Sequence, residues 1–263
     1  MNCFITTHPT EPTMGTCIRR TLTTPPVIPA DGERLKTNLD TDFLKLIAIT
    51  AMFIDHIGGA FFPELGIFRW IGRLAFPIFC YCMTVGLLYT RSVKKYLFRL
   101  GIFALVSQPF YILAFHPVSR FIENLTNWNI FFTLFLSLLG MYGLKERKWW
   151  LFVLALFTVS WWNFDYSSTG IQLMLIFYLC RNHPGIGAGL YALSYLPAFW
   201  TGWPEDPLCL TVGDFCIDWS IFALLALPLI FCRTHSHIKV NRWIFYAFYP
   251  AHLALIALIQ NIL

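Results

Sequence analysis

Long apolar runs separated by short polar loops dominate the chain from residue 43 to its end. A bilayer core about 30 Å thick is crossed by roughly 20 apolar residues in a helix. The pattern therefore predicts an all-α, polytopic integral membrane protein with about nine transmembrane helices, and eight to ten would fit the weaker runs. The predicted spans are residues 43–62, 70–90, 96–115, 128–144, 149–164, 169–181, 186–200, 215–232 and 243–262.

The first 42 residues lack this pattern. They contain five prolines and several threonines, and no apolar run follows the pair Arg19 and Arg20. A secretory signal peptide needs such a run directly after its basic residues. We therefore predict a disordered cytoplasmic tail, residues 1–42, followed by one membrane domain, residues 43–263.

The composition agrees with a membrane protein. Hydrophobic residues make up 57% of the chain and charged residues only 13%, whereas soluble domains carry about 25% charged residues. Aromatic residues, at 18%, suit the two interfaces of a bilayer. The net charge of +5 does not indicate nucleic-acid binding, because the basic residues lie in loops rather than along one stripe.

The loop charges predict the orientation. With a cytoplasmic N-terminus and nine spans, eleven Lys and Arg residues face the cytoplasm, whereas the other side carries only Arg69 and Arg120. Basic loops are retained on the cytoplasmic side of a membrane. This orientation places the C-terminus outside and predicts a multi-pass protein of a bacterial inner (cell) membrane, in contact with membrane lipid.

Ionisable residues inside the spans are the best candidates for functional groups, because each is costly to bury in a bilayer. Lys45 and His56 lie eleven residues apart in the first span, which puts them on one helix stripe about 16 Å apart. Lys45 fits either a snorkelling end anchor or a cavity residue. His56 fits either a structural hydrogen-bonding group or a catalytic one.

Asp55 needs a cationic partner on another span. It cannot orient its neighbour His56 from the same face, because adjacent helical residues diverge by about 100°. Arg73 is the expected partner, since an unpaired buried charge is strongly destabilising, and the pair fits a structural or an active-site role. Arg69 shares a face with Arg73 and fits an anion-binding site or an interface anchor. Pro77 is expected to kink the second span.

Few other sequence features point to chemistry. The chain has no P-loop, dinucleotide-binding, zinc-protease or serine-hydrolase motif, and no metal site is expected. Cys209 and Cys216 flank an expected outer loop and fit equally a disulfide or two free thiols. Further polar residues in or beside the spans are Arg99, Asn129, Asp165, Tyr249 and His252, and the last four are second-rank candidates for the same cavity.

Several short motifs distributed over residues 43–262 resemble one known family when taken together. They are residues 44–48, 55–58, 72–79, 96–100, 107–110, 129–134, 165–170 and 248–253. In combination they resemble the TraX family, whose members are described as membrane acetylases that modify the N-terminus of pilin in conjugation. The family is similar to the membrane acyltransferase type-3 group, which modifies surface sugars. Lys45 and His56 match the spacing of the basic residue and histidine in the first span of that group.

The resemblance implies an acetyltransferase that moves an acetyl group from acetyl-CoA, without a metal, to a pilin N-terminus or another cell-surface acceptor such as a glycan. His56 would be the general base, Arg73 would stabilise the developing oxyanion, and Asp55 would hold Arg73 in place. Lys45, Arg69 and Arg99 would bind the donor. The alternatives are a small-molecule transporter and a non-catalytic membrane assembly factor.

Overall fold

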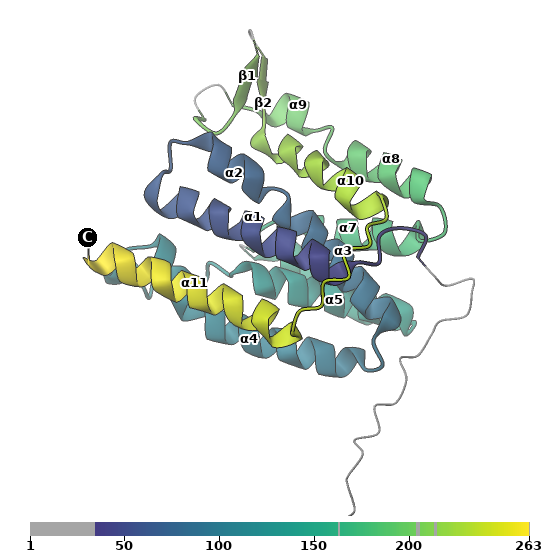
Figure 1. Cartoon of the computed structure of the whole chain (residues 1–263). Coiled ribbons are helices and arrows are strands. Elements are labelled where there is room, and N and C mark those ends of the chain that lie inside the picture. Colours follow the sequence, from purple (N-terminus) through teal and green to yellow (C-terminus); the bar gives the residue numbers. More distant parts are fainter. Residues whose placement is uncertain (1–34, 163, 204–205, 213–214, 263) are drawn as a thin grey trace, which may run out of the picture.

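The structure is a computed structural model that describes residues 35–162, 164–203, 206–212 and 215–262 (Figure 1). The predicted disorder of residues 1–34 falls outside this part of the chain. The helices are α1 (Thr41–Phe61), α2 (Gly66–Gly72), α3 (Ala75–Tyr89), α4 (Val93–Phe115), α5 (Ile130–Lys145), α6 (Trp149–Trp161), α7 (Thr169–Leu179), α8 (Pro184–Ser194), α9 (Ala198–Thr201), α10 (Ala226–Phe231) and α11 (Arg242–Ile262), with 3-10 helices η2 (Val118–Arg120) and η3 (Trp219–Leu225) and strands β1 (Leu210–Val212) and β2 (Phe215–Ile217).

Four helical segments in the described residues are long and apolar enough to cross a membrane: Thr41–Phe61, Gly66–Tyr89, Val93–Phe115 and Arg242–Gln260. They coincide with the first, second, third and ninth predicted spans. The remaining apolar helices are shorter; α6, with 13 residues, is only about 20 Å long. The mainly helical membrane fold is therefore confirmed, whereas the count of nine full spans is not.

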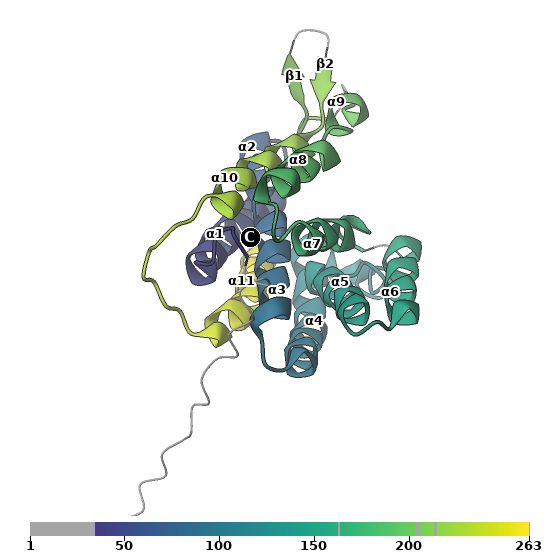
Figure 2. The same ribbon diagram turned by 90° about the vertical axis from the view of Figure 1, so that its right-hand side faces the viewer.

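Two of the predicted spans are wrong in detail. The segment 186–200 is interrupted at Tyr195–Pro197, where α8 gives way to the short α9. The segment 215–232 begins as strand β2, which pairs with β1 in an antiparallel hairpin, and becomes helical only from Trp219. Apolar composition alone does not distinguish a short strand from the start of a helix. In Figure 2 the hairpin projects beyond the helices.

The predicted domain boundary at residue 42 lies too late, because residues 35–40 pack against the helices. Leu35, Thr37 and Asn38 are buried. Tyr81 of α3 donates a hydrogen bond to the Asn38 carbonyl, and the Asn38 side chain donates to the Leu229 carbonyl of α10 at 2.8 Å. The segment before α1 therefore joins α1 to α3 and α10.

The centre of the fold is the packing of α1 on α2 and α3, and α11 fills the space between α1 and α4 (Figure 1). The predicted break in the second span is present: α2 ends at Gly72, and α3 begins at Ala75 with Pro77 in its first turn, where proline is tolerated. Small residues allow the close contact between α1 and α2. A Cβ atom added at Gly58 would overlap Phe68, and one added at Gly72 would overlap the Asp55 side chain.

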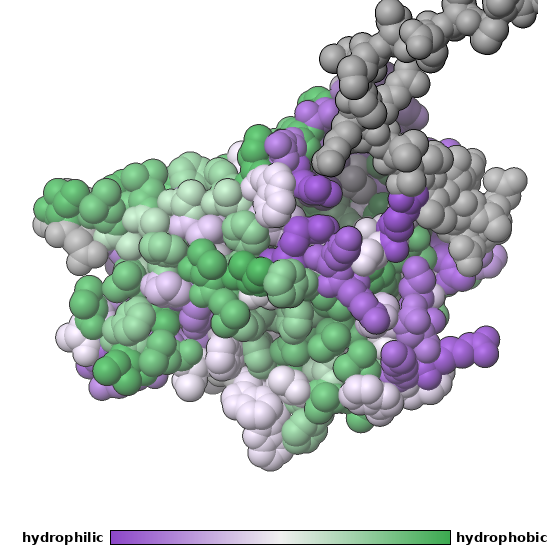
Figure 3. All heavy atoms as spheres, turned by 90° about the horizontal axis from the view of Figure 1, so that it is seen from below, coloured by the Kyte–Doolittle hydropathy of each residue, from purple (hydrophilic) through white to green (hydrophobic). Residues whose placement is uncertain are grey.

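The outer surface suits a lipid environment. On α6, Trp149, Trp150, Val153, Phe157 and Trp161 are all exposed, and a soluble protein would not leave such a row uncovered. Figure 3 shows apolar residues over much of one face, with hydrophilic residues gathered toward the end at which α11 begins. This distribution is expected of a protein whose middle lies in hydrocarbon and whose ends reach water.

The close contact of α1 with α2 predicts the effect of adding single methyl groups. Gly58→Ala and Gly72→Ala each force atoms apart in packed regions and should destabilise the fold by about 1–3 kcal/mol. Gly189→Ala is the matched control, because its added Cβ meets nothing within 4 Å. Thermal unfolding in detergent measures the effect. Equal transition temperatures for all three variants would contradict this packing.

Candidate active site

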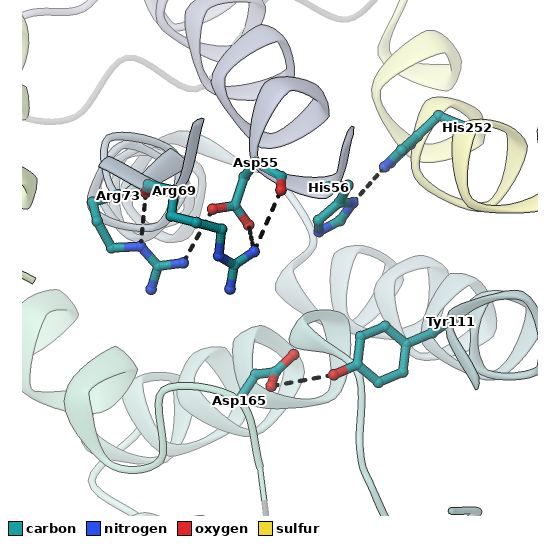
Figure 4. A network of polar contacts seen from close by, with 7 residues as sticks. All are labelled: Asp55, His56, Arg69, Arg73, Tyr111, Asp165 and His252. Atoms are coloured by element: carbon teal, nitrogen blue, oxygen red, sulfur yellow. Dashed lines mark hydrogen bonds and ion pairs between the residues drawn. The ribbon is translucent and has the colours of Figure 1, made fainter. Parts of the chain in front are cut away.

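A cavity of about 460 Å³ opens between α1, α2, α3, α4 and the loop before α7. We call it the His56 cavity. Its wall includes the predicted catalytic residues Asp55, His56 and Arg73, together with Arg69 and Asp165. Figure 4 shows these side chains converging from α1, α2, the α2–α3 turn and the α6–α7 loop on one space. These five residues, which the sequence singles out as ionisable groups in or beside apolar segments, thus share one pocket.

Asp55 is the centre of a charge cluster. Its carboxylate accepts a hydrogen bond from Arg69 at 2.8 Å through one oxygen and from Arg73 at 3.3 Å through the other (Figure 4). The predicted Asp55–Arg73 pair is therefore confirmed, and Arg69 is a second partner. The Arg73 guanidinium also lies 4.0 Å from the centre of the Trp219 ring, a favourable cation–π geometry. Two cations share one carboxylate, so the cluster keeps a net positive charge.

His56 turns away from Asp55, as the helix geometry predicts, and contacts His252 of α11. Its Nδ1 lies 2.7 Å from Nε2 of His252, whose Nδ1 lies 2.7 Å from the Phe248 carbonyl oxygen (Figure 4). A carbonyl only accepts, so a neutral His252 carries its proton on Nδ1 and accepts at Nε2. His56 then donates from Nδ1, which leaves its Nε2 lone pair unprotonated at the cavity wall.

Asp165 lies opposite the arginine cluster, in the loop between α6 and α7. Tyr111 of α4 donates a hydrogen bond to its carboxylate at 3.4 Å, and Thr133 donates to its backbone carbonyl at 2.6 Å. Burial raises the pKa of Asp165 to about 6. This carboxyl group can therefore gain or lose a proton near neutral pH inside the cavity.

Tyr249 and Asn129, two of the second-rank candidates, have different surroundings. Tyr249 lines the His56 cavity, with its ring centre 5.8 Å from that of His56. Asn129 and His252 do not line it, so the prediction that these two are cavity residues is wrong; His252 instead contacts His56. Asn129 is fully buried; its side chain donates to the Ala104 carbonyl and to Gln108, and accepts from the Phe131 backbone N–H. Asn129 therefore caps α5 and joins it to α4.

The three predicted donor-binding residues do not lie together. Arg69 belongs to the Asp55 cluster in the His56 cavity. Lys45 and Arg99 line a separate cavity of about 300 Å³, which we call the Lys45 cavity. Lys45 also pairs with Asp42 at 3.3 Å. Lys45 and His56, predicted to lie on one stripe of α1, thus line two different cavities along that helix.

Sequence reasoning missed three residues that complete the His56 cavity, namely Tyr111, Tyr166 and Trp219. Aromatic residues within apolar runs are ordinary in membrane segments, so these three carry no distinctive signal. Only the position of Tyr166 directly after Asp165 could have singled it out. Their placement beside the arginines and Asp165 depends on contacts between elements far apart in the chain.

Comparison with known proteins assigns the chain to a family. The family model described as "TraX protein" matches residues 40–260, which includes every residue of the Asp55 cluster and both histidines. The chain belongs to the TraX family. The similarity to the acyltransferase type-3 group, by contrast, stays a prediction.

The chain is also similar to two known proteins, the first of which supports this assignment. The chain is 31% identical over 246 residues to the probable fimbrial assembly protein FimC, serogroup H1, of Dichelobacter nodosus, a match that covers 81% of this chain and 92% of the relative. It is 30% identical over 156 residues to an uncharacterized protein of Rickettsia prowazekii (strain Madrid E), covering 56% of this chain and 58% of that protein. No solved structure matches.

Removal of the Asp55 charge tests the cluster. Asp55→Asn leaves the half-buried Arg69 and Arg73 without their carboxylate, and breaking a buried ion pair costs about 3–5 kcal/mol. Asp42→Asn is the matched control, because the Asp42–Lys45 pair is more exposed and such pairs contribute at most about 1 kcal/mol. Unfolding in detergent compares the two variants. Equal losses of stability would contradict the central role of the cluster.

Proposed function

We propose that this TraX-family protein is a membrane-embedded acetyltransferase that moves an acetyl group from acetyl-CoA to a pilin N-terminus or another cell-surface acceptor. The observation that carries the proposal is that His56, hydrogen-bonded to His252, lines one cavity together with the Asp55–Arg69–Arg73 cluster. Acyl transfer requires a base near the nucleophile and positive charge near the developing oxyanion. Both lie in the His56 cavity.

His56 acts as the base through Nε2. The acceptor amine or hydroxyl attacks the thioester carbonyl while its proton passes to His56 Nε2. His252 accepts a hydrogen bond from Nδ1 and so stabilises the imidazolium that forms, while its own contact with the Phe248 carbonyl fixes its orientation. The carbon–sulfur bond then breaks as the new bond to nitrogen or oxygen is completed, and His56 returns the proton to the leaving thiolate.

Arg73 and Arg69 stabilise the negative charge that develops on the carbonyl oxygen. Their shared carboxylate holds both guanidiniums in place without neutralising them fully. Preorganised donors of this kind contribute about 3–4 kcal/mol each in known acyl-transfer sites. Asp165, with its pKa near neutrality, supplies a second proton acceptor on the acceptor side of the cavity.

The loop charges and one relative support the proposed setting. We place the protein in the bacterial inner membrane as a multi-pass protein with a cytoplasmic N-terminus, because the basic loops favour that side. Acetyl-CoA is then reached from the cytoplasm, and the acceptor from the outer face. The similarity to a probable fimbrial assembly protein supports a role in pilus or fimbrial assembly, in which a non-catalytic assembly factor is the second candidate.

Label transfer tests the proposal. Full-length protein in proteoliposomes receives labelled acetyl-CoA together with a pilin N-terminal peptide or, separately, a surface-glycan fragment. His56→Ala should lower transfer by at least about 100-fold, the usual effect of losing a general base. His183→Ala, which lies in the α7–α8 loop outside the cavity wall, is the control and should transfer at the wild-type rate. Transfer that survives His56→Ala would refute His56 as the base, whereas no transfer by the wild-type protein to either acceptor would refute the enzyme and favour the assembly factor.

A further inference from the structure

The Lys45 cavity and the His56 cavity lie along the same set of helices. On α11, Tyr246 lines the first and Tyr249, one turn later, lines the second. On α3, Phe79 lines the first and Phe76 the second, and α1 supplies Lys45 to one and His56 to the other. The two cavities therefore follow one another along a single interhelical space.

An aromatic contact joins the walls of the two cavities. Phe131 of α5 lines the Lys45 cavity, Tyr249 lines the His56 cavity, and the centres of their rings are 4.4 Å apart. The two rings are therefore in contact at the boundary between the two spaces. Both rings are buried, so opening a passage needs a change of side-chain rotamer at one or both of them, which is a smaller movement than a shift of the helices.

The Lys45 cavity has the charge of an anion site with apolar walls. Lys45, Arg99 and Arg242 line it, and none of its described lining residues is acidic. Asp42, which pairs with Lys45, offsets one of the three positive charges. The Arg99 Nε atom is buried without a hydrogen-bond partner among the described residues. An unsatisfied buried cationic N–H is costly, and a phosphate oxygen would satisfy it.

We propose that the Lys45 cavity binds the phosphate-bearing end of the acyl donor, and that Phe131 and Tyr249 form a movable partition through which the thioester arm reaches His56. This inference rests on the proposed acetyl transfer. It adds a phosphate subsite, with Arg242 as a third cation, and a route between two sites about 16 Å apart on α1. The phosphates stay among the cations, and the flexible arm carries the acyl group past the ring pair.

Binding of coenzyme A tests the phosphate subsite without any transfer. Full-length protein in nanodiscs of neutral phosphatidylcholine is titrated with coenzyme A. Arg99→Gln should raise the Kd at least about tenfold, because it removes a charged hydrogen-bond donor. Lys94→Gln is the control, an exposed cation on the same helix outside the cavity, and should change the Kd less than about twofold. Equal losses in both variants would overturn the subsite.

Anionic lipid is the competing source of phosphate. The titration is repeated in phosphatidylglycerol nanodiscs. A loss of coenzyme A affinity that occurs in the wild type but not in Arg99→Gln would assign the cavity to a lipid headgroup and overturn the donor assignment. An equal change in both proteins would reflect only the membrane surface charge and would support the donor.

Chemical trapping tests the partition. In Met52→Cys the new thiol lies in the His56 cavity, and coenzyme A disulfide can exchange with it, forming a mixed disulfide and releasing one coenzyme A thiol. Mass spectrometry should find this adduct at residue 52. The added change Phe131→Trp should lower the trapping rate at least about tenfold by narrowing the partition, whereas Phe132→Trp, whose ring packs on Trp128, should not.

The outcomes distinguish a failure of the proposed path of the thioester arm from a failure of the proposed acetyl transfer. Trapping that Phe131→Trp leaves unchanged would show that the arm enters the His56 cavity from another side, and absence of the adduct would show that it does not reach residue 52; either result overturns the partition. Because trapping and binding need no acceptor, they stand even if acetyl transfer fails. Loss of transfer with intact trapping would refute the proposed function alone.

Discussion

The Asp55 carboxylate holds the candidate site together. It joins α1 to Arg69 of α2 and to Arg73 in the turn before α3, and these three elements carry most of the His56 cavity. The carboxylate reaches both arginines only because Gly72 leaves room for it. Charges in an apolar setting are tolerated when they are paired. The ion pairs that allow these charges to be buried therefore also fix two guanidiniums where an oxyanion would form.

The histidine pair is held by hydrogen bonds between neutral groups, whereas the Asp55 cluster is held by ion pairs. A chain of hydrogen bonds from His56 through His252 to the Phe248 carbonyl sets the tautomer of both rings. The chain connects α1 to α11, the first and last long helices, so the base exists only once the fold is complete. Asp55 and the arginines therefore supply fixed charge, and the histidines supply a proton acceptor that is neutral before the reaction.

Sequence reasoning succeeded where a local rule decided the outcome. Four long apolar runs became long helical segments, the second of them broken between α2 and α3. Asp55 paired with Arg73 because a buried charge requires a counter-charge. It failed where the outcome depended on distant contacts. His252 is 196 residues from His56, and no spacing rule links them as partners. Arg69 and Lys45 are both basic residues beside or inside an apolar run. Arg69 nevertheless pairs with Asp55, whereas Lys45 lines a different cavity. Asn129 was misread because a helix-capping residue and a cavity residue are equally polar.

The central claim is that His56 and His252 work as one unit, and a double-mutant comparison of acetyl transfer tests it most directly. Rates are measured for His56→Ala, His252→Ala and the double variant in proteoliposomes at matched protein levels. Residues that act as a unit give strongly non-additive losses. The account predicts that the double variant is no slower than His56→Ala alone. Losses that multiply in the double variant would show that the two histidines act independently and would contradict the account.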